Sequence, residues 1–183
     1  WEFRFAPLVS ENLRTKRRGK AGRSWYLDET YIEVSGRWRY LYRAIDREGN
    51  LHDSMLSEHR DNVARRFLRR LLDSAGQKQL RMTTDKHPAH TKAIRWIVGR
   101  KVLHRDNQYL NNRMEQSHRS IKQRYYPMLG FAKFESASRF CTAFDELQNY
   151  LRVDRSGNKR NTPTDRRRIF NSKWTTLMTE LSA

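Results

Sequence analysis

The first part of the chain carries three short segments in which large apolar residues alternate with polar ones. These segments are residues 24–34, 37–46 and 51–57. Each segment is rich in aromatic and β-branched residues, which favour strands. Ser35-Gly36 and Gly49-Asn50 separate the segments, and both pairs are typical of tight turns. The pattern therefore predicts an antiparallel meander of three strands.

After residue 60 the apolar positions recur every three or four residues, which is the spacing of amphipathic helices. Helices are predicted over residues 61–75, 88–99, 113–126 and 136–153, and short strands over residues 80–85 and 102–105. Up to the helix over residues 113–126 the element order is β-β-β-α-β-α-β-α. This order predicts an α/β domain over residues 24–153, with a mixed five-stranded sheet flanked by helices.

Basic segments flank this predicted core on both sides. Residues 1–23 include the run Arg14–Arg23, which offers little to bury and predicts an arm or linker. Contact with a DNA backbone and plain solvation remain alternatives for this run. Residues 154–183 are interpreted as a basic tail that could end in a single amphipathic turn.

The charge of the chain indicates a polyanionic partner. Lys and Arg number 38 against 20 Asp and Glu, which gives a formal net charge of +18 over 183 residues. A surface with this excess of cations attracts phosphate backbones and releases their counterions on binding. Nucleic acid is therefore the partner that the composition favours.

Cysteine content and hydropathy limit the remaining protein classes. Cys141 is the one cysteine, so an internal disulfide and a multi-cysteine zinc site are excluded, and its apolar neighbours predict a core position. No apolar run approaches the roughly 20 residues that span a bilayer. We expect no membrane partner and a cytoplasmic, nucleoid-associated protein.

Three carboxylates stand at positions where the predicted sheet could bring them together. Asp28 lies in the middle of the first strand, Asp85 ends the strand over residues 80–85, and Glu115 opens a helix. A strand-centre acid between aromatic residues is costly unless it has a purpose. Asp85 falls at the carboxyl edge of the sheet, where α/β proteins bind ligands. Two divalent ions about 4 Å apart, held by such carboxylates, can cut a phosphodiester.

Each carboxylate also has a structural alternative. An Asp at the end of a strand often caps a helix or a turn, and a helical Glu is usually solvated. Glu29 would point to the face opposite Asp28 because strand side chains alternate, and Asp46 adjoins a turn. We assign neither of these two residues to the site.

Four sequence blocks resemble a known family. They are LDETYIEVSGRWRYLYRAID, TTDKHPA, YLNNRMEQSHRSIK and MLGFAKFESA. In combination they are similar to the corresponding blocks of bacterial insertion-sequence transposases of the IS-six family, and the resemblance runs from about Trp1 to Val153. It implies an RNase H-like, integrase-type catalytic core of the DDE type.

The resemblance also implies roles for single residues. It matches Asp28, Asp85 and Glu115 to the three metal-binding catalytic carboxylates of the family. Lys122 lies seven residues after Glu115, which places it two turns further along the same helix face. It resembles the basic residue that contacts DNA near the site in many such enzymes.

Two departures from the family pattern affect what the residues predict. Between Asp85 and Glu115 stand 29 residues (115 − 85 − 1), a shorter interval than the family leads us to expect. The chain begins at Trp1, as if just after the helix-turn-helix that family members carry. We therefore expect recognition of the element ends to be absent from these residues.

Other polar residues near the three carboxylates could contact DNA or a metal. The candidate DNA contacts are Lys86, Arg113, His118, Arg119, Lys122 and Arg124. His87 and His90 could bind zinc, although histidines at a helix entry more often cap the helix or face solvent. Asn111 and Asn112 are favoured as helix caps. The aromatic residues at positions 38, 40 and 42 are more typical of a sheet surface than of a base-stacking platform.

The predicted function is DNA strand cleavage followed by strand transfer, with Mg²⁺ as the ion and Mn²⁺ as a substitute. Double-stranded DNA is the expected substrate, and a homodimer is expected because two element ends must be joined. One alternative is an RNase H-type nuclease or a retroviral-type integrase. The other is a truncated remnant that binds DNA without cutting it.

Overall fold

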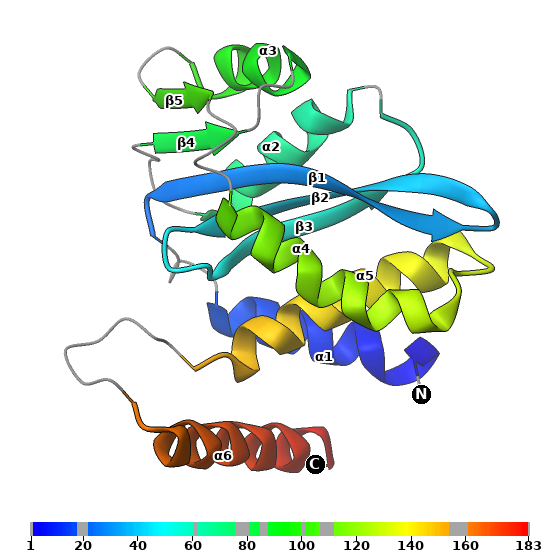
Figure 1. The fold of residues 1–183 in the computed structure, drawn as a ribbon, viewed down its shortest axis with the longest axis vertical. Coiled ribbons are helices and arrows are strands. Elements are labelled where there is room, and N and C mark those ends of the chain that lie inside the picture. The colour runs from blue at the N-terminus through cyan, green and yellow to red at the C-terminus, as the bar shows by residue number, and fades with distance from the viewer. Residues whose placement is uncertain are drawn as a thin grey trace.

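The computed structural model of the chain describes residues 2–17, 22–60, 62–75, 81–84, 88–99, 102–106, 112–153 and 161–182. Within these residues a central sheet carries helices on both faces (Figure 1). The strands are β1 (Ser24–Val34), β2 (Arg37–Asp46), β3 (Leu51–Ser57), β4 (Arg81–Thr84) and β5 (Leu103–Asp106). The helices are α1 (Glu2–Arg17), α2 (Val63–Ala75), α3 (Pro88–Ile97), α4 (Asn112–Tyr125), α5 (Phe134–Leu151) and α6 (Pro163–Ser182), with the 3₁₀ helix η2 (Tyr126–Met128).

The first three strands form the antiparallel meander that the sequence predicts. A two-residue turn joins β1 to β2, and both of its residues have positive φ, 51° at Ser35 and 69° at Gly36. Positive φ at both positions is the geometry whose twist matches a two-residue hairpin. The turn places Val34 opposite Arg37 and continues the register to Trp25 opposite Asp46.

β4 and β5 extend the sheet on the other side of β1. The strand order is β3-β2-β1-β4-β5, with β4 parallel to β1 and β5 parallel to β4. β1 is therefore the central strand, between an antiparallel half and a parallel half. The predicted mixed five-stranded sheet is confirmed.

Helices α2 and α3 cover one face of the sheet. Their apolar residues form one cluster with side chains from β1, β2 and β4, and Trp25, Phe67, Leu71 and Met82 are among its most buried members. The Tyr42 ring packs against the Phe67 ring with 6.0 Å between centroids. Burial of these large side chains supplies most of the stabilisation on this face.

Helices α4 and α5 cover the other face. Ile32 and Leu41 of the sheet pack with Ile121 of α4 and with Ala137 and Cys141 of α5. Cys141 is a free, buried thiol, which confirms its predicted core position. Burial raises the pKa of this thiol far above its usual range. The thiol is therefore protonated and unreactive at neutral pH.

The N-terminal segment differs from the arm or linker that the sequence predicts. Residues 2–17 form helix α1, which packs along α5, instead of an arm or linker (Figure 1). Val9 and Leu13 recur one turn apart, and both are buried against Leu177 of α6. Arg17, from the basic run, forms a paired ion bridge to Glu146 of α5 at 2.7 Å for both contacts. The start of the basic run thus belongs to the folded domain, because Arg14 and Arg17 pair with the buried carboxylates of Asp53 and Glu146.

The C-terminal segment is also more ordered than predicted. Residues 163–182 form the 20-residue helix α6 instead of a tail with a single turn. Lys173 donates hydrogen bonds to the backbone oxygens of Tyr150 and Arg152, at 2.8 and 2.7 Å, and so satisfies carbonyls at the end of α5. Thr162 and Asp165 cap the start of α6 reciprocally.

Candidate active site at the junction of β1 and α4

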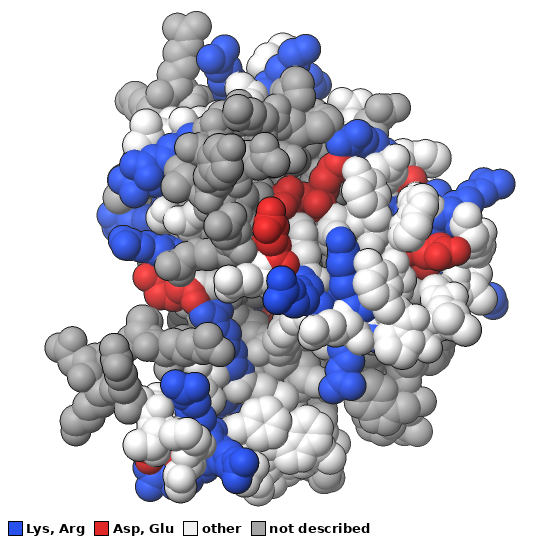
Figure 2. Space-filling model, viewed as in Figure 1, with Lys and Arg blue, Asp and Glu red and all other residues white. Residues whose placement is uncertain are grey.

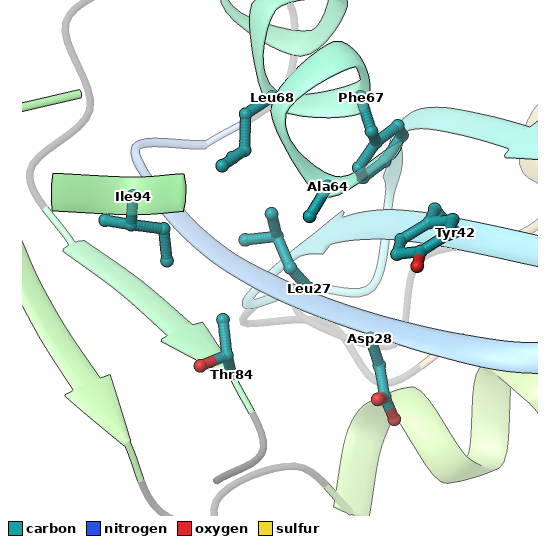
Figure 3. Close-up of a pocket in the computed structure, with 8 residues that line it drawn as sticks. All are labelled: Leu27, Asp28, Tyr42, Ala64, Phe67, Leu68, Thr84 and Ile94. Carbon is teal, nitrogen blue, oxygen red and sulfur yellow. The ribbon is translucent and has the colours of Figure 1, made fainter. Parts of the chain in front are cut away.

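Asp28 projects from the central strand toward α4. Its neighbour Leu27 points into a small pocket beneath α2 and α3, whereas the Asp28 carboxylate points away from that pocket toward α4 (Figure 3). This alternation follows from the two-residue period of a strand. Asp28 is half-buried, and its Oδ1 accepts a hydrogen bond from the backbone N–H of Glu29 at 2.9 Å.

Helix α4 lies over Asp28 because its buried residues are spaced by four and three positions and so form one face of the helix. Met114, His118, Ile121 and Tyr125 are buried on one stripe of the helix. Met114 packs in a cluster that Tyr26 joins, and Ile121 packs in a cluster with Ile32. Tyr26 and Ile32 flank Asp28 on the same face of β1, so Asp28 faces the turns of α4 between Met114 and Ile121.

Glu115 follows Met114 at the start of this helix and is exposed. It therefore lies beside the stripe that packs on the sheet, at the end of α4 nearest to Asp28. Figure 2 shows acidic side chains gathered near the centre of the face where β1 and the start of α4 lie in Figure 1, with basic side chains around them. Two of the three predicted carboxylates thus come from elements that pack on each other.

The third predicted carboxylate, Asp85, lies outside the described residues. The strand that leads to it is described, and Thr84 pairs with Leu27 in the parallel register of β4 on β1. In the sequence, Asp28 directly follows Leu27 and Asp85 directly follows Thr84. Thr84 is fully buried, and its Oγ1 lies 2.9 Å from Nε2 of His104, which ties the end of β4 to the second residue of β5.

Basic side chains surround the exposed side of α4. Arg119 and Arg124 are exposed, and Lys122 is half-buried on the face that Glu115 shares. The side chains of Arg113 and Lys86 lie outside the described set. The described part of α4 therefore carries three cations on the helix that bears Glu115.

His118 was predicted to contact DNA, and the structure does not place it on the surface. Its side chain is 6% exposed, beneath α4, so it cannot reach a phosphate from this position. Burial, together with the nearby charges of Arg43 and Lys122, lowers the pKa of His118 to about 3. The imidazole is therefore neutral at physiological pH. The sequence placed it one turn after Glu115 and could not show that this turn faces the sheet.

The competing acids have structural roles. Glu29 lies on the face opposite Asp28, as alternation predicts, and pairs with Arg60. Asp46 is buried and accepts hydrogen bonds from the backbone N–H groups of Asn50, at 2.7 Å, and Gly22, at 3.1 Å. Asp46 therefore closes the turn after β2.

The remaining sequence candidates do not form a second site in the described residues. The side chains of His87, His90, Asn111 and Asn112 lie outside them. The aromatic stripe of β2 is divided, with Trp38 59% exposed and Tyr42 buried in the core. The part of the chain that the structure describes contains no group of three or more His, Cys, Asp or Glu side chains placed to hold a metal ion. In the same residues no helix is long and apolar enough to cross a membrane.

A buried ion pair next to Asp28 escaped the sequence analysis. Arg43 of β2 stands directly opposite Asp28 in the strand register, and it is 2% exposed. Its Nη2 donates to Asp145 of α5 at 2.7 Å, and its Nε donates to the same carboxylate at 3.2 Å. Burial raises the pKa of Asp145, and the Arg43 guanidinium opposes this rise. The signal was an Arg between the apolar residues Tyr42 and Ala44, in the half of the strand that is buried.

Comparison with known proteins agrees with the sequence blocks. Residues 22–154 match a family model described as a DDE domain. The transposase for insertion sequence-like element IS431mec from Staphylococcus aureus strain Mu50 is 40% identical over 129 residues, which cover 68% of this chain and 57% of that protein. The transposase for insertion sequence element IS257 in transposon Tn4003, also from Staphylococcus aureus, gives the same values. The chain thus spans 57% of the length of these curated relatives.

One solved structure relates the fold to a viral complex. A chain of the simian T-cell lymphotropic virus intasome in complex with PP2A regulatory subunit B56 gamma superposes with a TM-score of 0.52 at 13% identity. The superposition covers 84% of this chain and 56% of that one. The predicted RNase H-like fold is confirmed. Because the family model spans more than two thirds of the residues and the curated matches agree with it, the chain belongs to the DDE-domain transposases of IS-six insertion sequences.

Proposed function

We propose that this chain is the catalytic core of a transposase that cuts DNA at the ends of an insertion sequence and joins the freed strand to target DNA. The observation that carries the proposal is the direction of the Asp28 side chain, which points from the central strand toward the helix that bears Glu115 (Figure 3). The family match and the formal charge of +18 support the same activity.

The donor set fits a hard divalent cation. Asp28 and Glu115 offer carboxylate oxygens, which Mg²⁺ and Mn²⁺ prefer. Cys141 is a buried, protonated thiol and His118 is buried beneath α4, so burial keeps both from competing as soft ligands. Asp28, Asp85 and Glu115 would hold the ions. When bound, Mg²⁺ would lower the pKa of the attacking water or hydroxyl and neutralise charge on the scissile phosphate.

The protein's own contribution is positioning. Asp28 is fixed in the middle of a strand that hydrogen-bonds to a neighbour on each side, and Glu115 is fixed by the burial of Met114 at the preceding helical position. Rigid placement of this kind keeps the carboxylates within the narrow geometry that in-line displacement requires. Arg119, Lys122 and Arg124 would bind the DNA backbone beside them, and Arg113 and Lys86 complete the proposed contact surface.

The proposal includes a homodimer on DNA, because two element ends must be cut and joined together. A single core carries one set of carboxylates, so each end would occupy one protomer. The test is the mass of the complex with end DNA, measured by light scattering at low salt. A mass of two chains per joined pair of ends supports this arrangement, and a single chain per pair would refute it.

A cleavage assay tests the activity itself. The change is Asp28→Asn, which keeps the size of the side chain and removes its charge. We expect cleavage and joining of end-labelled element DNA in Mn²⁺ to fall by at least about a hundredfold. Glu29→Gln is the matched control, since Glu29 is the adjacent acid and points to the opposite face. Equal loss in both variants would contradict the assignment of Asp28.

The same assay separates the rival activities. Joining of the labelled end to a second duplex indicates a strand transferase. Cleavage of RNA in an RNA–DNA hybrid without any joining would favour an RNase H-type nuclease. DNA binding without cleavage in either metal would favour a DNA-binding remnant.

A further inference from the structure

Arg43 occupies an unusual position for a cation, next to the proposed catalytic Asp28. The two residues are direct partners in the antiparallel register of β1 and β2. Direct partners project to the same face of a sheet, with Cβ atoms about 4.5–5.5 Å apart. Arg43 is 2% exposed, so its guanidinium is removed from water on the same face as the Asp28 carboxylate.

Asp145 holds this guanidinium in a fixed orientation. The two hydrogen bonds, from Nη2 and Nε, engage both oxygens of the Asp145 carboxylate. Asp145 is itself 1% exposed, within the middle of α5. A planar guanidinium bound at two points cannot rotate, so its third nitrogen, Nη1, has a fixed direction as well.

Among the described residues, the buried polar atoms without a hydrogen-bond partner include Nη1 of Arg43. They also include Nε2 of His118 on α4, one turn after Glu115. His118 lies close enough to Arg43 to experience its charge. Nη1 carries two N–H groups, and buried donors of this kind are expected to have acceptors.

We propose that Arg43 is a positioning residue for the metal-binding carboxylates: its Nη1, which has no hydrogen-bond partner in this structure, is a donor available to the Asp28 carboxylate and to Nε2 of His118. This role rests on the proposed function. It would tie the strand that carries Asp28 to the helix that carries Glu115, while Asp145 keeps the bridge in place and neutralises its charge. Hydrogen bonds of this type orient the carboxylates that ligate metal ions.

The pairing with Asp145 is essential to this arrangement. An uncompensated cation beside Asp28 would repel divalent ions, whereas the Arg43–Asp145 pair is neutral and still presents N–H donors. Asp145→Asn should therefore weaken Mn²⁺ binding. If the pair served only to join α5 to the sheet, this substitution would leave Mn²⁺ affinity unchanged.

The experiment compares Mn²⁺ affinity, thermal stability and single-turnover DNA cleavage in the full chain. The principal variant is the double substitution Arg43→Met with Asp145→Leu, which replaces the whole pair by apolar side chains and avoids a lone buried charge. We expect cooperative unfolding to persist, Mn²⁺ affinity to fall by about 10- to 100-fold, and the cleavage rate to fall while the KM for DNA stays nearly unchanged. The matched control is Arg17→Met with Glu146→Leu, the other paired ion bridge of α5, which joins α1 and should leave Mn²⁺ affinity unchanged.

Arg43→Lys is the second variant, in case the double substitution prevents folding. Lysine keeps the charge opposite Asp145 but cannot donate in three fixed directions, so we expect a folded protein with at least about tenfold weaker Mn²⁺ binding. Wild-type Mn²⁺ affinity and cleavage in either folded variant would overturn the role of Arg43. Failure of the proposed function would give a different result. The wild-type protein and Asp28→Asn would then bind Mn²⁺ equally, or neither would bind it.

Discussion

Asp28 shows how the position of a single residue in a strand determines what its side chain can do. One residue earlier, Leu27 is buried in the core beneath α2, whereas Asp28 reaches the opposite face, where α4 passes over it. A shift of the register by one residue would exchange these two side chains and abolish both the core contact and the site. The hydrophobic core and the candidate site therefore depend on the same register.

Two buried histidines make the stability of the protein depend on pH. Burial lowers the pKa of His52 from 6.5 to about 4, and its ring lies 4.5 Å from that of Trp25. At pH values between these two pKa values the unfolded chain binds a proton that the folded chain does not. The free energy of unfolding therefore falls as the pH falls. His118 acts in the same direction, with a folded pKa of about 3.

Urea unfolding at pH 7 and pH 5 measures this effect. We expect His52 alone to cost on the order of 2 kcal/mol of unfolding free energy between these two pH values. His52→Gln should have a correspondingly smaller loss, with the remainder due to His118 and other groups. A loss of the same size in His52→Gln and in the wild type would show that His52 is not buried as a neutral ring.

At the scale of elements, helix α4 connects packing to the candidate site. Its buried stripe fixes the helix on β1, and Glu115 and Lys122 lie beside that stripe. Ile121 is fully buried at the centre of this contact. The placement of Glu115 therefore depends on apolar residues that take no part in the chemistry.

Removal of the Ile121 side chain tests this dependence. Ile121→Ala should lower the unfolding free energy by about 2–5 kcal/mol, since it leaves a cavity between α4 and the sheet. Gln123→Ala, at an exposed position of the same helix, should change it by less than about 0.5 kcal/mol. Chemical denaturation measures both values, and similar values for the two variants would contradict the packing of α4.

The elements differ in how well the sequence predicts them, and the reason is the range of the interactions involved. The strands over residues 24–34, 37–46 and 51–57 are predicted with their observed ends, because alternation and turn residues are local signals. Helix α1 was missed, since Pro7 and the basic residues from Arg14 onward weaken its helical pattern, and its partners in α5 and α6 are distant in sequence. The Arg43–Asp145 pair joins residues 102 positions apart, so no local sequence pattern predicts it. Burial of His118 was missed for the same reason: it depends on which side of α4 meets the sheet.

At the scale of the whole molecule, the excess of cations should determine how DNA binding depends on salt. Phosphate contacts release counterions, so the affinity falls with salt in proportion to the number of contacts. The formal charge of +18 is spread over the surface, but the proposed function assigns the contacts mainly to α4.

Paired substitutions distinguish a local contact from a general charge effect. Arg119→Gln with Arg124→Gln should reduce the slope of log Kd against log salt concentration by about 2. Arg66→Gln with Arg69→Gln removes the same charge from exposed positions of α2, on the other face of the sheet, and should leave the slope unchanged. Equal changes in the two variants would mean that net charge, and not the α4 surface, governs binding.

The most direct test of the central claim is a crystal structure of the chain grown with Mn²⁺, with the ions located by their anomalous scattering. We expect two peaks about 4 Å apart, ligated by Asp28, Asp85 and Glu115, with Arg43 next to Asp28. Peaks that lie away from these three carboxylates, or no peaks with Asp28 and Glu115 ordered in the crystal, would contradict the proposed active site.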